Sequence, residues 1–181
     1  MGNKESAKFK GIWKIEVFEG IELANGDRVA GKLISESSCQ NIITDEGLNH
    51  ILNVVLHGAT PISPWYCGLY EDNQAGTAAM TYDVPVFTEC TAYDEATRQE
   101  YVEAESSAKS ITNSASKAAF TASDTKTLYG AALFSINTKG DHVSDPGSIL
   151  LCAGLFAVAQ PVIDGNVVNL TYTVTSADDG V

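Results

Sequence analysis

Carboxylates are the side chains in this sequence best suited to chemistry, and they gather between residues 94 and 105. Paired carboxylates can move protons in general acid–base catalysis or hold a hard cation such as Ca²⁺. The calcium-loop pattern DxDxDG is absent, however, and no candidate nucleophile accompanies these acids. We interpret the segment as a solvated acidic stretch with aromatic anchors. Its carboxylates belong to Asp94, Glu95, Glu100, Glu103 and Glu105.

An acid–base enzyme would use these carboxylates differently. It would bring Glu89, Asp94 and Glu95 into one deep cleft and raise the pKa of their carboxyl groups. A structural protein that assembles with other subunits would need no such cleft and would instead carry apolar surface at its contacts with them. The two classes of protein therefore differ in where these three carboxylates lie.

The other ligand-type and nucleophile-type residues are scattered along the chain. His50, His57 and His142 have no second ligand nearby in the sequence, so we expect them to cap the helix or lie on the surface. The cysteines form no CxxC pair, which favours reduced thiols in the core, with one disulfide as the alternative. They are Cys39, Cys67, Cys90 and Cys152. Nucleophile-elbow, P-loop, HExxH and dinucleotide-binding patterns are absent. We therefore expect no enzyme, no catalytic residue, no metal site and no cofactor.

Charge and hydropathy restrict the class of partner. The chain of 181 residues has 11 basic and 23 acidic residues and a formal net charge of −12. That charge repels phosphate backbones and anionic lipid, so we expect neither nucleic acid nor a membrane as a partner. No apolar run reaches the length of a membrane span, and the first residues lack the apolar core of a signal peptide. We expect the product to be made and kept in a cytoplasm.

The basic residues are unevenly placed. Residues 1–8 are polar and predict an N-terminal arm that is flexible or ordered by a partner. Four of the eleven basic residues lie within the first fourteen positions, namely Lys4, Lys8, Lys10 and Lys14. We interpret these lysines as candidate contacts to an acidic surface on a neighbouring subunit, the alternative being a merely solubilising tail.

One helix is predicted at about residues 45–57. Thr44 is a suitable N-cap, and His57 with Gly58 supplies a stop. Four apolar residues recur at the spacing of one helical face, which predicts that this face is buried. They are Leu48, Ile51, Leu52 and Val55. If Leu52 is buried, Leu52→Ala should cost about 2 to 5 kcal/mol.

The remaining pattern is that of strands. Residues 9–18 alternate, with Trp13, Ile15 and Val17 on one face, and Asn25-Gly26 signals a hairpin turn. Further strands are predicted at 65–70, at 127–136, at 148–159 ending before Pro161, at 166–176, and as two short strands within 110–123. A buried helix is the alternative for 148–159. Long exposed loops are expected at 71–85 and 138–148. The sequence predicts a mainly β protein, β-sandwich or jelly-roll-like, with a single domain at 9–177 and a tail at 178–181.

Several stretches add a likeness to a known family. In chain order they are GIWKIEVF, NIITDEGLNHILNVVLHGATPISPWYCGLYE, FTECTAYDEATRQEYVEA, SITNSASKAAFT, LYGAALF and GNVVNLTYTVT. Together they resemble a set of small virion structural proteins of tailed bacteriophages, in which an N-[LI]-[VI]-T-x-x-G-L helix is followed by a W-Y-x-G-L strand and a Y-x-E-x-x-R block. The resemblance spans roughly residues 12–175, and Gln99 stands where proline is expected.

The resemblance implies a location and partners. Proteins of this kind include head decoration, or cement, proteins and also tail, collar or fibre components. It implies a bacteriophage virion protein that binds the major capsid protein of the assembled head, or alternatively tail or collar proteins with a host-receptor contact. It also implies a homo-oligomer located in the virion.

Overall fold

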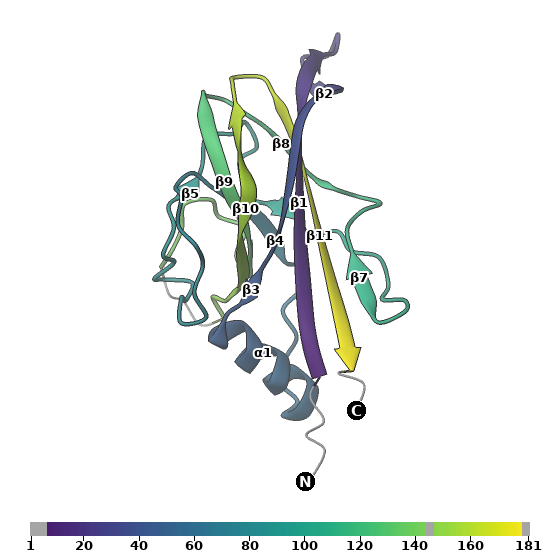
Figure 1. The fold of residues 1–181 in the computed structure, drawn as a ribbon, viewed down its shortest axis with the longest axis vertical. Helices are drawn as coiled ribbons and strands as arrows, with labels where there is room; N and C mark the ends of the chain where they lie inside the picture. Colours follow the sequence, from purple (N-terminus) through teal and green to yellow (C-terminus); the bar gives the residue numbers. More distant parts are fainter. Residues whose placement is uncertain (1–6, 144–146, 179–181) are drawn as a thin grey trace.

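The structure, a computed structural model, describes residues 7–143 and 147–178. Two antiparallel sheets form a sandwich (Figure 1). The first sheet contains β1 (Ala7–Glu22), β2 (Arg28–Gln40), β7 (Ser110–Thr112), β8 (Ala118–Thr121) and β11 (Val167–Asp178), in the order β2-β1-β11-β7 with β8 also paired to β11. The second contains β3 (Ile42–Ile43), β4 (Tyr66–Tyr70), β5 (Glu89–Cys90), β6 (Gln99–Glu100), β9 (Lys126–Phe134) and β10 (Leu150–Val162), in the order β3-β10-β9-β4-β5 with β6 paired to β4. The predicted mainly β sandwich is confirmed.

The core between the sheets follows the predicted alternation. Trp13, Ile15 and Val17 of β1 are fully buried, because successive side chains of a strand point to opposite faces. On the neighbouring strand β11, Leu170 and Tyr172 are buried in the same cluster, and the Trp13 and Tyr172 rings stack with their centroids 4.1 Å apart. The periodicity of β1 and β11 thus defines the core side of the first sheet.

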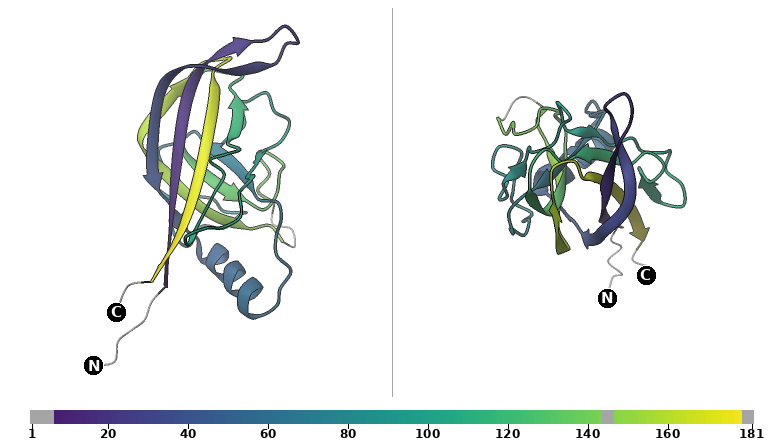
Figure 2. Two further views of the ribbon diagram at one scale, coloured as in Figure 1. Left: turned by 90° about the vertical axis from the view of Figure 1, so that its right-hand side faces the viewer. Right: turned by 90° about the horizontal axis from the view of Figure 1, so that it is seen from above.

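Strand β1 is longer than predicted and extends past the sandwich at both ends (Figure 2). At one end it forms a hairpin with β2 through the predicted turn, where Gly26 has a positive φ of 87°. At the other end its first residues pair with the end of β11, Ala7 opposite Asp178, and form a two-stranded ribbon. Residues 7 and 8 and Asp178 thus belong to strands, while residues 1–6 and 179–181 lie outside the described part of the chain.

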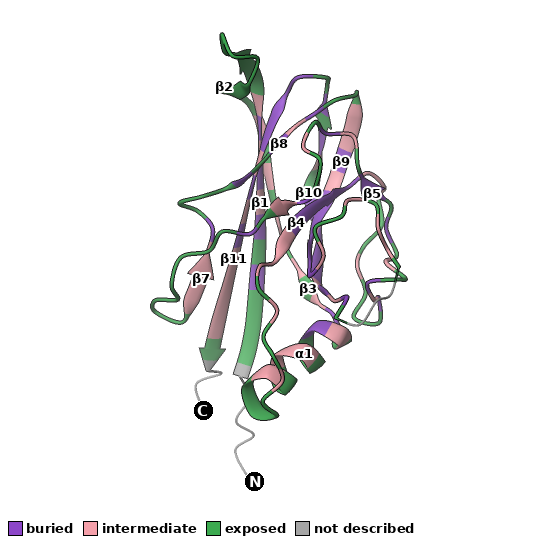
Figure 3. Ribbon diagram, turned by 180° about the vertical axis from the view of Figure 1, so that it is seen from behind, coloured by how far each residue is buried: buried purple, intermediate pink, exposed green. Residues whose placement is uncertain are grey.

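Residues 71–88 cover the outer face of the second sheet. They contain no helix or strand, as predicted, but they are not simply exposed. Met80, Tyr82 and Phe87 are buried against the sheet, and the Phe87 ring stacks on Tyr70 with centroids 4.5 Å apart. Figure 3 shows buried and exposed positions interleaved in this segment. The expectation of an exposed loop was wrong because these three anchors are spread through a segment whose Gly, Asn, Asp and Pro residues indicate a loop.

Strands β9 and β10 pair closely through glycine. A side chain at Gly130 would overlap the Tyr70 ring and the Gly154 carbonyl, so the strand backbones approach closely at Gly130. Pro161 does not end its strand as predicted. It lies inside β10 opposite Thr127, beyond a register shift that begins at Leu155. Irregular pairing is where proline is tolerated in a strand.

Helix α1 (Asp45–Leu56) lies at the end of the sandwich where both chain ends emerge (Figures 1 and 2). Its predicted N-cap is confirmed: the Thr44 hydroxyl accepts a hydrogen bond from the Gly47 N–H at 2.8 Å and donates one to the Leu150 carbonyl at 2.5 Å. His57 ends the helix, its N–H donating to the Asn53 carbonyl. Thr44 therefore both starts the helix and ties it to β10.

Candidate interaction surface

The apolar face of α1 points away from the sandwich. Leu52, Val55 and Leu56 are 54%, 71% and 79% exposed, and Leu48 is exposed as well. Of the four residues predicted to face the core only Ile51 is even half-buried, so the prediction of a buried face was wrong. An uncovered apolar helix face marks a site of interaction with another molecule.

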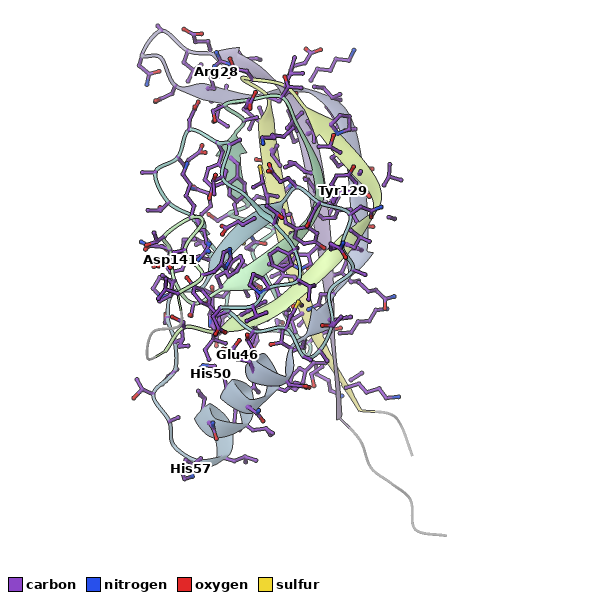
Figure 4. The ribbon with its side chains drawn as sticks, turned by 90° about the vertical axis from the view of Figure 1, so that its left-hand side faces the viewer. Arg28, Glu46, His50, His57, Tyr129 and Asp141 are labelled. Atoms are coloured by element: carbon purple, nitrogen blue, oxygen red, sulfur yellow. The ribbon has the colours of Figure 1, made fainter. Side chains whose placement is uncertain are left out.

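The helix contacts the sandwich through a different side. Gly47 is its one buried residue and lies against the backbone of Leu151. Farther along, His50 and Val54 line a small apolar hollow of about 220 Å³ beside Trp65, with the His50 and Trp65 rings edge to face at 5.6 Å. Burial lowers the pKa of His50. Figure 4 shows His50 and His57 on the helix at this end of the molecule.

This placement of the helix determines the expected effect of two substitutions. A Cβ at Gly47 would lie 2.5 Å from the Leu151 carbonyl oxygen, so Gly47→Ala forces backbone apart. We expect a net loss of about 1 to 2 kcal/mol, because overpacking outweighs the gain in helix propensity of about 1 kcal/mol. Leu52→Ala, by contrast, should change the free energy of unfolding by less than about 0.5 kcal/mol. Chemical denaturation measures both; a loss above 2 kcal/mol for Leu52→Ala would place that side chain in the core.

A groove separates α1 from the ribbon formed by the ends of β1 and β11. Its apolar lining includes Phe9, Ile43 and Leu48, and Lys8 and Lys10 lie along it. The volume of the groove is about 570 Å³. We call this feature the ribbon groove. It joins the exposed face of α1 to the most basic part of the described chain.

The four candidate lysines therefore have different surroundings. Lys8 and Lys10 are exposed on β1, and neither forms an ion pair with another described residue. Lys14 is engaged within its own sheet, 3.1 Å from Glu16 and 2.9 Å from Glu36. Lys4 lies outside the described residues. Only Lys8 and Lys10 are thus placed as free cations at the ribbon groove.

The opposite end of the molecule is the β1–β2 hairpin, which also carries uncovered apolar residues. Those that are exposed there are Ile21, Leu23, Val29, Leu33 and Ile34. The turn closes through a hydrogen bond from the Leu23 N–H to the Asp27 carbonyl at 2.8 Å. Figure 4 marks Arg28 at this end, far from His57.

The three carboxylates considered for acid–base chemistry do not share a cleft. Asp94 and Glu95 line a hollow of about 540 Å³ beneath the hairpin, and Glu95 accepts a hydrogen bond from the Thr121 N–H at 3.0 Å. Glu89 lies elsewhere, buried beside Arg98. Burial alone would raise the pKa of Glu89, but the hydrogen bonds from Arg98, His142 and the Gly140 N–H, together with the charge of Arg98, outweigh it, so the pKa is lowered. The arrangement expected of an acid–base pair is therefore not formed by these residues.

Arg98 is the centre of a buried polar cluster. Its Nε and Nη2 donate to the two carboxylate oxygens of Glu89, both at 2.7 Å, and its Nη1 donates to the Tyr82 hydroxyl at 3.1 Å. The guanidinium lies 3.9 Å from the centroid of the Phe134 ring. His142 also joins the cluster, with Nε2 3.1 Å from Glu89, and is therefore neither a cap nor a surface residue. All these groups are held by each other, which gives the cluster a structural role.

Little in the sequence predicted the cluster around Arg98. Arg98 was visible as one of only two arginines and as part of the Y-x-E-x-x-R block, but its partner Glu89 lies nine residues away and His142 forty-four. Two of its other hydrogen bonds go to the backbone carbonyls of Ile136 and Asp141. Contacts to carbonyls leave no pattern in a sequence.

The structure also shows the state of the four cysteines and whether ligand-type side chains gather into a metal site. All four cysteines are free thiols, and burial raises the pKa of Cys39 to about 12 and that of Cys90 to about 11. Across residues 7–143 and 147–178, no group of three or more His, Cys, Asp or Glu side chains is placed to hold a metal ion. In the same ranges no helix is both long and apolar enough to cross a membrane.

The chain matches no protein-family model and no curated protein. The likeness to phage virion proteins consequently stays a hypothesis that depends on the motifs quoted above. The features with an uncovered apolar surface, α1 with the ribbon groove and the β1–β2 hairpin, are the candidate sites of interaction.

Proposed function

We propose that this protein is a structural protein of a tailed-bacteriophage particle, a decoration protein that binds the major capsid protein on the assembled head. The family motifs support the choice of particle. In this role copies of the chain form a homo-oligomer on the shell, bind no cofactor and turn over no substrate. The virion is then its final location.

The observation that carries the proposal is the exposed apolar face of α1. A helix of 12 residues is too short to be stable alone, so it depends on what it contacts. Leu52, Val55 and Leu56 offer an apolar stripe at one end of a rigid sandwich. A decoration protein needs a surface of this kind, because many weak contacts made at once by an oligomer hold it firmly to a shell.

The first test is the position of the protein on particles of its phage, seen by electron microscopy of a tagged protein. We expect the tag on heads. A tag found only on tails or collars would contradict the head assignment and favour the tail or fibre role, and a tag absent from particles would contradict the virion role altogether.

The second test asks whether α1 makes the contact. Purified protein is added to particles that lack it, and occupancy is measured against protein concentration. Burying a valine is worth about 1.5 to 3 kcal/mol, so Val55→Ser should weaken binding about tenfold or more. Val158→Ser is the matched control, since Val158 is 63% exposed on β10. Equal binding by both variants would exclude α1 from the contact.

A further inference from the structure

We propose that the tip of the β1–β2 hairpin of one copy docks into the ribbon groove of a second copy. This inference rests on the proposed function, in which copies of the chain meet on a shell. It adds the contact through which two copies bind each other. The hairpin tip is defined as residues 22–27 and the ribbon groove as above.

The hairpin lacks cover in the single chain. It is an extension of two strands that projects beyond the sandwich (Figure 2), and a two-stranded hairpin is marginally stable in water by itself. Ile21, Leu23 and Val29 are all more than 40% exposed. A partner that covered these side chains would stabilise the hairpin while burying apolar surface.

The tip is acidic around an apolar anchor. Glu22 and Asp27 flank Leu23, and the tip contains no basic residue, which gives it a net charge of −2. Arg28 follows directly, but its side chain folds back over the turn at Gly165 and lies 3.8 Å from Glu22. The end of the hairpin therefore presents one leucine and two carboxylates, of which Glu22 is already paired with Arg28.

The ribbon groove is complementary to the hairpin tip both in charge and in apolar surface. Among the described residues of its lining, Lys8 and Lys10 give a charge of +2 and the others are uncharged. Phe9 and Leu48 offer an apolar floor, and both are exposed in the single chain. A groove of about 570 Å³ has room for a leucine side chain and the turn that carries it.

We infer that the occupant is a second copy of this chain, because its own hairpin tip and ribbon groove are complementary. The rest of the molecular surface would repel another copy. With a net charge of −12, most self-contacts bring like charges together. The contact of tip and groove instead pairs free lysines with carboxylates. The tip and the groove lie at opposite ends of the long axis (Figure 1), so the contact is heterologous and builds either a ring or an open chain of subunits.

Charge exchange tests the contact in solution with no particle present. Lys8→Glu with Lys10→Glu makes tip and groove both acidic, and Glu22→Lys with Asp27→Lys makes both basic. By light scattering at low salt, the intact chain should associate and each variant alone should associate at least about tenfold more weakly, since like charges oppose docking. A mixture of the two variants in equal amounts should regain association, because each tip again meets a groove of opposite charge.

The control is Glu103→Lys with Glu105→Lys, which makes the same change of charge on an exposed segment outside both surfaces and should leave association intact. Circular dichroism and thermal unfolding confirm that every variant is folded. A monomeric intact chain, variants that associate normally, a mixture that regains nothing, or loss of association in the control would each overturn the proposal. Val55→Ser should associate normally here, so failure of this contact is distinguishable from failure of shell binding.

Discussion

Arg98→Ala is expected to lower the free energy of unfolding by about 3 to 5 kcal/mol. The side chain is fully buried, and its removal leaves the Glu89 carboxylate buried without its partner. An ionised carboxylate with no partner is very costly in such surroundings. The same substitution removes the guanidinium from the Phe134 ring and two hydrogen bonds from backbone carbonyls. Denaturant unfolding followed by fluorescence measures the loss.

Arg28→Ala is the matched control, because it removes the only other arginine. Arg28 forms an exposed ion pair of 3.8 Å with Glu22, and such pairs contribute about 0 to 1 kcal/mol. The double variant Arg98→Met with Glu89→Leu should recover much of the loss, since apolar replacement of both partners leaves no unpaired charge. A loss below 1 kcal/mol for Arg98→Ala would mean that the cluster does not stabilise the fold.

Trp13→Ala is expected to cost a similar amount, about 3 to 5 kcal/mol. Trp13 is fully buried between the sheets and stacks on Tyr172 at 4.1 Å. The strands around it cannot close the gap, because they are held in register with β1 on both sides. The substitution therefore leaves a cavity as well as removing apolar surface from the core.

Ile12→Ala is the control for Trp13→Ala. Ile12 precedes Trp13 on β1 but points to the other face of the sheet and is 41% exposed. We expect it to cost less than about 1 kcal/mol. Thermal unfolding of the two variants should show a large difference in midpoint; similar midpoints would indicate that Trp13 does not organise the core.

The local elements of this protein could be predicted from the sequence because short-range chemistry specifies them. The alternation of Trp13, Ile15 and Val17 identified a half-buried strand, and Asn25-Gly26 identified a hairpin turn. Thr44 marked the start of the helix within one residue. Each of these features depends on neighbours in the chain, and each is present in the structure.

Which side chains of an element are buried depended on contacts between segments that are distant in the sequence. Spacing showed that α1 has an apolar face, but a pattern cannot say whether the chain itself or another molecule covers it. The tertiary structure left Leu52 and Val55 uncovered because Gly47 is the point at which α1 meets β10. In the same way, the burial of Met80 within residues 71–88 depends on the sheet that this segment crosses.

The candidate sites show the same division. A mainly β sandwich with one helix could be predicted from the sequence, as could a cluster of lysines near the start of the chain. The tertiary structure was needed to show that Lys14 pairs within its sheet, that Lys8 and Lys10 form no ion pair with another described residue, and that Arg98 meets Glu89. Charge pairing depends on distance in space, and strand register sets that distance. Strand register also placed the acidic hairpin tip and the basic groove at opposite ends of β1.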